Sequence, residues 1–244
     1  MKSYRKYFIF YILLFSPMTI AETLSVLVFE GSNPPYTITK NGENSGIFVD
    51  LFLKLSQVTD LNFDLQNYPA ARGLQEFDMG RVDIEPGVNE KWRQNTKVLG
   101  LYSIPYNYSR EVIVFKKANA ITVNNAQDLY GKSIGIVRGY SYPKFDDAFN
   151  KNLITKVSNR SEKLLLKQLQ ADRIKYIFIG YRTIKYYMQQ NPQYRNIVIG
   201  DTVSQVEVKL RIHPNKAYLL PTLNKGLATL LKNGDIDKIY SKYQ

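Results

Sequence analysis

The chain has 244 residues and a net charge of +12, with 33 basic and 21 acidic residues, no cysteine and a single histidine. The absence of cysteine excludes disulfide bridges, and with only one histidine it argues against a zinc site. No metal and no cofactor is expected. The lysines and arginines are scattered, with no run longer than Lys116-Lys117. The scattered excess of basic residues therefore predicts a charged, solvated surface and no nucleic-acid binding.

Residues 1–21 have the three-part layout of a secretory signal peptide. Three basic residues precede an unbroken apolar run at 7–15, and Thr19-Ile20-Ala21 supplies the small residues of a cleavage site. The run is shorter than the roughly 20 apolar residues that span a bilayer. We therefore predict cleavage after Ala21 and release into a periplasm. Loss of the three basic charges lowers the net charge from +12 to +9. Without a cysteine, the mature chain has no site for a lipid anchor.

Strand-length apolar runs alternate with segments of helical period in the first half of the mature chain. Strands are predicted at 24–29, 61–65 and 82–84, and helices at 46–58 and 70–79. This β-α-β-α-β order is typical of a mainly parallel sheet with crossover helices.

The pattern starts afresh after Tyr108. The second half has further predicted strands and helices, with Ser161 as the expected N-cap of one helix. Strands are predicted at 111–115, 134–137, 154–157, 174–179 and 206–212, and helices at 126–129, 142–149, 161–171, 182–190, 220–232 and 236–243.

These elements predict two α/β lobes of ordinary domain size. Residues 22–110 together with 208–244 are assigned to lobe 1, and residues 111–207 to lobe 2. The joints near 107–115 and 205–212 are extended, which indicates a hinge made of two crossing segments. A cleft between the lobes is then the expected ligand site.

Short motifs in the mature chain resemble, in their expected order, the bacterial extracellular solute-binding proteins of family 3, the polar amino-acid receptors of ABC importers. The motifs are Asn33-Pro34-Pro35-Tyr36, 46–51 (GIFVDL), 80–84 (GRVDI), Arg93, 102–106 (YSIPY), 128–135 (DLYGKSIG) and 233–240 (NGDIDKIY). The resemblance implies a type II periplasmic-binding-protein fold, with two lobes that close on a ligand.

The same resemblance assigns ligand-binding roles in lobe 1. Arg93 is expected to grip the ligand's carboxylate, a task that suits the planar guanidinium fork. Gly87 and Val88 are expected to offer backbone donors nearby. Tyr36 follows a rigid turn that aims its ring at the cleft. Arg72 resembles an arginine that one branch of the family has at the start of this helix.

In lobe 2 the loop Arg138-Gly139-Tyr140-Ser141 leads from a strand into a helix, where glycine and the helix-start amides suit an anionic group. Tyr181 is a further expected ligand contact. The family usually has an aspartate for the ligand's ammonium beside it, where this chain has Gly180. Either another acid such as Glu85 or Glu90 supplies the charge, or the ligand has no cationic group. The arginines favour a ligand of net negative character: Arg72, Arg93, Arg138 and Arg182.

The resulting prediction is a monomeric receptor that captures a small amino acid or related carboxylate and delivers it to an ABC permease. A periplasmic sensor subunit is the alternative, and a catalytic relative of the fold is a third reading. Asp83 and Glu85 share one strand face, but no other feature supports an acid/base pair. The single histidine, His213, is expected at the surface. We therefore predict no enzymatic activity.

Overall fold

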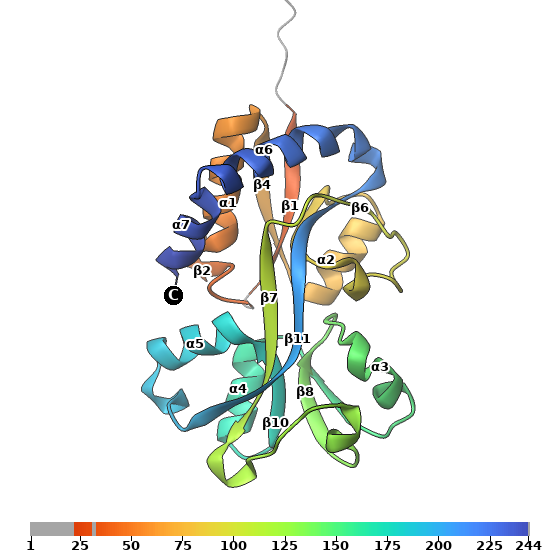
Figure 1. Ribbon diagram of the computed structural model, residues 1–244, viewed down its shortest axis with the longest axis vertical. Coiled ribbons are helices and arrows are strands. Elements are labelled where there is room, and N and C mark those ends of the chain that lie inside the picture. The colour runs from red at the N-terminus through yellow and green to blue at the C-terminus, as the bar shows by residue number, and fades with distance from the viewer. Residues whose placement is uncertain (1–21, 31–32, 244) are drawn as a thin grey trace, which may run out of the picture.

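The computed structural model describes residues 22–30 and 33–243, and shows two α/β lobes joined through a pair of long strands (Figure 1). The predicted signal peptide lies outside the described residues. Within the described ranges, no helix combines the length and the apolar character needed to cross a bilayer.

The first lobe is built around β1 (Thr23–Phe29), which pairs in parallel with β4 (Asn62–Tyr68) on one side and with β5 (Ile84–Val88) on the other. Its helices and remaining strands are α1 (Ile47–Thr59), α2 (Ala70–Asp78), β2 (Ile38–Lys40), β3 (Glu43–Ser45) and β6 (Leu101–Tyr102). The predicted alternation of strands and helices is confirmed here, whereas the β2–β3 hairpin and β6 were not predicted.

The second lobe repeats the same alternation. Strand β8 (Ser133–Val137) pairs in parallel with both β9 (Thr155–Asn159) and β10 (Tyr176–Gly180). The helices are α3 (Pro143–Asn150), α4 (Glu162–Gln170) and α5 (Tyr181–Gln190). Ser161 is the N-cap of α4 as predicted, and its hydroxyl accepts a hydrogen bond from the Leu164 amide at 3.4 Å.

Two strands run through both lobes. β7 (Asn107–Lys116) and β11 (Ile197–Ile212) pair antiparallel from Ile197 opposite Lys116 to Val208 opposite Asn107 (Figure 1). The strands follow the order β4-β1-β5-β11-β7-β10-β8-β9, with β6 beside β11. The chain then returns to the first lobe through α6 (Leu220–Lys232) and α7 (Asp235–Lys242), which pack on α1. The two predicted hinge segments thus lie within β7 and β11.

Each lobe has its own apolar core. In the first lobe, side chains of β1 and α1 pack against α6 and α7, with Leu51 and Leu223 fully buried. In the second lobe, Phe178 of β10 is enclosed by aromatic rings of the α3 region. Full burial of one such side chain contributes about 1.5–3 kcal/mol. Ala70 and Phe29 of the first lobe also pack on the second-lobe core, so the two lobes are in contact.

Candidate ligand-binding site

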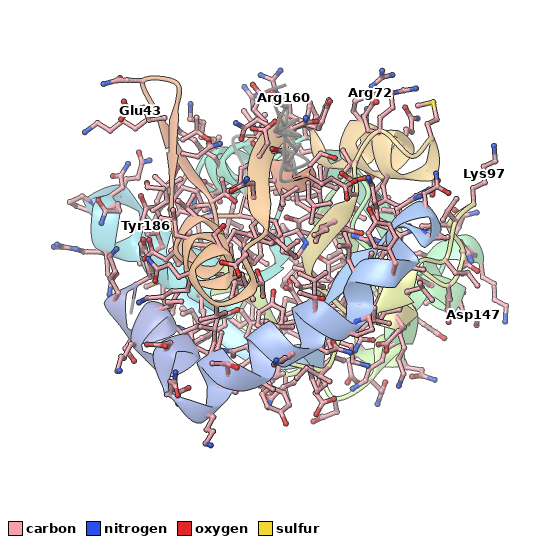
Figure 2. All side chains as sticks on the ribbon, turned by 90° about the horizontal axis from the view of Figure 1, so that it is seen from above. Glu43, Arg72, Lys97, Asp147, Arg160 and Tyr186 are labelled. Carbon is pink, nitrogen blue, oxygen red and sulfur yellow. The ribbon has the colours of Figure 1, made fainter. Side chains whose placement is uncertain are left out.

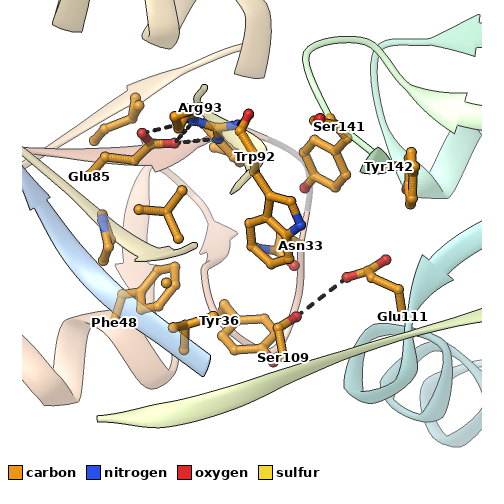
Figure 3. Close-up of a pocket in the computed structure, with 17 residues that line it drawn as sticks. Asn33, Tyr36, Phe48, Glu85, Trp92, Arg93, Ser109, Glu111, Ser141 and Tyr142 are labelled. Atoms are coloured by element: carbon orange, nitrogen blue, oxygen red, sulfur yellow. Dashed lines mark hydrogen bonds and ion pairs between the residues drawn. The ribbon is translucent and has the colours of Figure 1, made fainter. Parts of the chain in front are cut away.

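A cavity lies where the two lobes meet β7 (Figure 3). It offers about 70 Å³ to the centres of water-sized molecules, which is room for roughly five waters and suits a compact solute. The lining residues come from both lobes and from the crossing strands: Leu27, Phe29, Asn33, Tyr36, Phe48, Glu85, Pro86, Gly87, Val88, Trp92, Arg93, Ser109, Glu111, Tyr140, Ser141, Tyr142 and Val208.

Aromatic rings form much of the wall. Tyr36 and Phe48 lie with ring centroids 5.4 Å apart, and Trp92 points into the cavity beside them (Figure 3). Gly87 has φ +70°, and a Cβ there would lie 2.6 Å from the Phe48 ring, so the close approach requires glycine. Tyr140 closes the wall from the second lobe. Rings in this arrangement attract a cation through their negative faces.

Arg93 lines the cavity, but its guanidinium is already bound by an acid of the protein. Its Nε donates to both oxygens of Glu85 at 3.1 Å, and its Nη2 donates to Oε1 at 2.5 Å (Figure 3). Its Nη1 donates to the carbonyl of Trp92 at 3.0 Å. The Arg93 and Glu85 side chains are only 5% and 3% exposed. The ion pair is therefore shielded from water.

A second arginine, from the first-lobe part of β11, completes this cluster. Arg211 of β11 is fully buried, and its Nη1 donates to Glu85 Oε2 at 2.8 Å. Burial alone would raise the pKa of Glu85, but the charges and hydrogen bonds of Arg93 and Arg211 outweigh it and lower the pKa. Glu85 is thus held as a carboxylate between two guanidinium groups.

The remaining donors of Arg211 bind the loop before β6. Its Nε donates to the Leu99 carbonyl at 3.0 Å, and its Nη2 donates to Thr96 Oγ1 at 3.1 Å and to the Val98 carbonyl. Its guanidinium carbon lies 3.9 Å from the centroid of the Phe77 ring. Arg211 therefore holds Glu85, a lining residue, without lining the cavity itself.

Glu111 brings a different acid into the cavity from β7. Its Oε1 accepts a hydrogen bond from Ser109 at 3.5 Å, while its buried Oε2 has no hydrogen-bond partner among the described residues. Burial, followed by the nearby charge of Glu162, raises its pKa from the ordinary 4.5 to about 7, and the Ser109 hydrogen bond opposes this. The Oε2 atom is a buried acceptor that lacks a donor.

Glu111 also lies beside Gly180, the position without the expected aspartate. The two residues are direct partners in the β7–β10 pairing, and a Cβ built on Gly180 would lie 3.5 Å from Glu111 Oε1. The acids considered from the sequence are engaged elsewhere, since Glu85 binds two arginines and Glu90 pairs with Lys209. The carboxylate near Gly180 therefore comes from a neighbouring strand.

A polar contact across the lobes closes one side of the site. Glu162, the first residue of α4, accepts a hydrogen bond from the Tyr140 hydroxyl at 2.9 Å and another from the backbone amide of Asn33 at 3.1 Å. Burial, with the charge of Glu162, raises the pKa of Tyr140 well above its ordinary value. Tyr140 therefore stays a neutral donor, and the contact joins the Asn33 turn of the first lobe to the second lobe.

The structure brings six of the ten predicted site residues to the cavity. These are Tyr36, Gly87, Val88, Arg93, Tyr140 and Ser141. Sequence reasoning missed several other lining residues. For two of them, Ser109 and Glu111, the sequence contains a signal that could have identified them. Ser109 and Glu111 alternate along a strand whose next residues are apolar, so both face the same side of the sheet. The missed polar and aromatic residues are Phe29, Asn33, Phe48, Trp92, Ser109, Glu111 and Tyr142.

Arg72, Arg138 and Gly139 lie outside the cavity lining. Arg72 lies at the periphery of the molecule, where its side chain is 56% exposed and pairs with Glu76 at 2.5 Å (Figure 2). Arg138 is exposed. Gly139 lies against helix α2, where an added Cβ would be 3.2 Å from the Ala71 amide nitrogen.

Tyr181 lines a neighbouring groove, where the Arg110 guanidinium lies 4.6 Å from its ring centroid. Arg182 lines the same groove and stacks on Tyr240 at 5.0 Å. Of the four arginines that favoured an anionic ligand, only Arg93 belongs to the cavity lining, and there it is paired with Glu85. Each of their side chains is drawn to a nearer acid, ring or solvent.

The polar residues considered for catalysis have structural partners. Asp83 accepts hydrogen bonds from the Ser25 amide at 2.8 Å and from its hydroxyl at 2.7 Å. The expectation that His213 is exposed is wrong. It is 7% exposed, burial lowers its pKa, and its Nδ1 accepts a hydrogen bond from the Asn215 amide at 3.2 Å. Within residues 22–30 and 33–243, no cluster of three or more metal-ligating side chains is present.

Comparison with known proteins agrees with this geometry. The family model of the bacterial extracellular solute-binding proteins, family 3, matches residues 26–244. The L-cystine-binding protein TcyJ of Escherichia coli (strain K12) is 22% identical over 232 residues, which cover 92% of this chain and 84% of the relative. The arginine-binding periplasmic protein of Mannheimia haemolytica is 24% identical over 240 residues, which cover 95% of each chain.

Among solved structures, an ancestral arginine-binding protein bound to arginine superposes with a TM-score of 0.77 at 22% identity, covering 91% of this chain and 97% of that one. The predicted fold class, the two-lobed type II periplasmic-binding-protein fold, is confirmed. The family and these relatives are binding proteins and not enzymes. The chain belongs to the bacterial extracellular solute-binding proteins of family 3.

Proposed function

We propose that this protein captures a small solute bearing an ammonium group in the periplasm and delivers it to an ABC permease. The observation that supports the proposal most strongly is the buried Glu111 carboxylate, whose Oε2 lacks a hydrogen-bond partner among the described residues. An ammonium group would supply both the donor and the compensating charge. The relatives named for binding cystine and arginine also recognise ligands with amino groups.

Hinge closure provides the capture step in this proposal. An open form exposes the first-lobe wall of Tyr36, Phe48 and Trp92 to the solute. Closure then brings Glu111 and Tyr140 against it and forms the Glu162 contact to Asn33. A solute that touches both lobes stabilises the closed form over the open one. β7 and β11 are the strands about which the lobes would move, and a monomer is sufficient for this mechanism.

The proposal is tested with the intrinsic fluorescence of Trp92. Trp92 is the only tryptophan of the chain, and it lines the cavity. We expect arginine, lysine, ethanolamine or cadaverine, none of which absorbs in the measured range, to change its emission in a saturable titration. A Trp92→Phe variant gives the background for that change. If none of these solutes alters the emission or gives heat in calorimetry, capture of a small amine is refuted.

Binding of an ammonium group is expected to weaken in acid. The ammonium pairs with the ionised form of Glu111, and the raised pKa of about 7 means that this carboxyl is mostly protonated below pH 7 in the empty cavity. Below that value the measured Kd is expected to rise by up to about tenfold per pH unit. Glu162, Tyr36, Tyr140 and Tyr142 face Glu111, and the tyrosines remain neutral across this range because their pKa values are raised.

The check is a series of titrations between pH 5.5 and pH 8.5. A Glu111→Gln variant removes the titrating group, so its remaining weak binding is expected to be flat between pH 6 and pH 8. A wild-type affinity that is constant across this range, or that improves in acid, would remove Glu111 as the ionised partner.

A further inference from the structure

The charges that line the cavity are unequal at its two ends. The charged lining residues are Glu85, Arg93 and Glu111. At one end, Arg93 pairs with Glu85 at 2.5–3.1 Å. Arg211 also binds Glu85, and its charge is offset by Asp78, whose Oδ1 lies 3.8 Å from Arg211 Nη2. At the other end, Glu111 has an unpartnered oxygen. The lining therefore has one acidic charge in excess when Glu111 is ionised, and no unpaired cation.

Glu85 binds the Arg93 guanidinium in the way that the carboxylate of a ligand was expected to bind it. Its two oxygens receive the Nε and Nη2 donors of Arg93, and the free lone pairs of Oε2 bind Arg211. A carboxylate on the solute would have to displace this acid or enter the cavity beside it. Displacement would leave Glu85 with half of its compensation in a nearly dry site, which is costly for a buried charge.

The donors left on Arg93 suit a neutral acceptor. An arginine has five N–H groups. Three of these are used, on Nε, on Nη1 to the Trp92 carbonyl and on Nη2 to Glu85, so one N–H remains on each terminal nitrogen. In a charge-balanced pair, these donors bind a hydroxyl or carbonyl oxygen without requiring an anion.

The walls between the two ends favour a cation. Tyr36, Phe48, Trp92 and Tyr140 line the cavity with aromatic rings, and the second lobe adds Tyr142, whose buried hydroxyl has no hydrogen-bond partner among the described residues. Burial and the charge of Glu111 raise the pKa of Tyr142, so it remains neutral. Nothing in this lining offsets the charge of a carboxylate.

From this arrangement we infer that the solute is an organic amine without an α-carboxylate, because Glu85 already binds the guanidinium of Arg93, the arginine expected to bind a ligand's carboxylate. The inference rests on the proposed capture of an amine in this cavity and narrows its chemistry. The ammonium group binds Glu111, the carbon skeleton lies among the rings, and a hydroxyl or carbonyl of the solute reaches the free donors of Arg93.

The test compares each amine with the amino acid that differs from it only by an α-carboxylate. Calorimetry with the exported chain measures ethanolamine against serine, cadaverine against lysine, and tyramine against tyrosine. For the pairs that bind, the amine is expected to bind at least about tenfold more tightly than the amino acid. Each pair has the same side chain, so differences in skeleton cancel.

Two variants assign the preference to the Glu85–Arg93 pair. Glu85→Gln releases Arg93, and we expect it to shift the ratio of affinities toward the amino acid by at least about tenfold. The double variant Glu85→Gln/Arg93→Gln removes both charges of the pair and keeps this wall neutral, so we expect it to leave the ratio unchanged within about threefold. Glu90→Gln is the matched control, because Glu90 pairs with Lys209 and lies outside the cavity lining.

The outcomes separate this inference from the proposed function. If amino acids bind as tightly as their amines or more tightly, or if the double variant Glu85→Gln/Arg93→Gln selectively removes amino-acid binding, the inference is overturned while capture of a small solute stands. If no member of any pair binds and arginine does not bind either, the proposed function fails together with the inference.

Discussion

Replacement of Glu111 by glutamine is expected to weaken binding of an amine solute by about 100-fold. Truncating one partner of a buried charge pair costs about 2–5 kcal/mol, because the other charge loses its compensation in a desolvated site. Glutamine keeps the length of the side chain and removes the charge, so the shape of the cavity is preserved. Calorimetry or Trp92 fluorescence with the best-binding amine measures the change in Kd.

Glu207→Gln provides the matched control for this substitution. Glu207 lies on the adjacent strand β11, where it is exposed and outside the cavity lining. Its loss is expected to alter the Kd by less than about twofold, because the exposed Glu207 carboxylate is screened by solvent and accepts a hydrogen bond from the Tyr108 hydroxyl outside the cavity lining. Equal losses in both variants would indicate a general effect of negative charge near the hinge. An unchanged Kd in Glu111→Gln would mean that another group binds the amine.

The Arg211→Met variant is expected to lose about 3–5 kcal/mol of unfolding free energy, the usual cost of breaking a buried ion pair. Arg211 is fully buried, and its guanidinium holds Glu85, Thr96 and the carbonyls of the loop before β6. Methionine retains contact with Phe77 but donates no hydrogen bond. The carbonyls of Val98 and Leu99 would then lose the Arg211 donors that bind them.

Urea denaturation of the ligand-free protein measures this loss. Lys151→Met is the control, because Lys151 pairs with Asp147 at the surface, with both side chains more than 60% exposed. Its unfolding free energy is expected to change by less than about 0.5 kcal/mol. A loss of under 1 kcal/mol of unfolding free energy in Arg211→Met would show that the remaining pair of Glu85 with Arg93 is sufficient to stabilise this part of the first lobe.

The order of strands and helices could be predicted because it depends on local periodicity. Helix α1 has apolar residues at helical spacing, and the residues that were expected to form its buried face, such as Phe48 and Leu51, are buried. Strand β11 was predicted only from Val206, although it begins at Ile197. Its first part contains Gly200 and Asp201 and pairs with shifts in register, so the alternation that marks a strand is interrupted there.

The site could be predicted only in part. Tyr36 and Arg93 were found because they belong to motifs that resemble the family. Tyr140 was found because its loop leads from a strand into a helix, and all three residues line the cavity. Glu111 was missed because its importance comes from its partner across the sheet, Gly180, which is 69 positions away in sequence. No spacing rule along the chain relates two residues of different strands.

The sequence by itself determined the family and the two-lobed α/β architecture, and it predicted a cleft where the structure has a cavity lined from both lobes. These follow from the periodic spacing of apolar residues and from motifs whose residues are consecutive in the chain. Only the tertiary structure decided which charges are compensated. It placed Glu85 between Arg93 and Arg211 and left Glu111 with an unpartnered oxygen. The physical reason is that the free energy of a charge depends on its neighbours in space and on its distance from water, and neither is encoded by position along the chain.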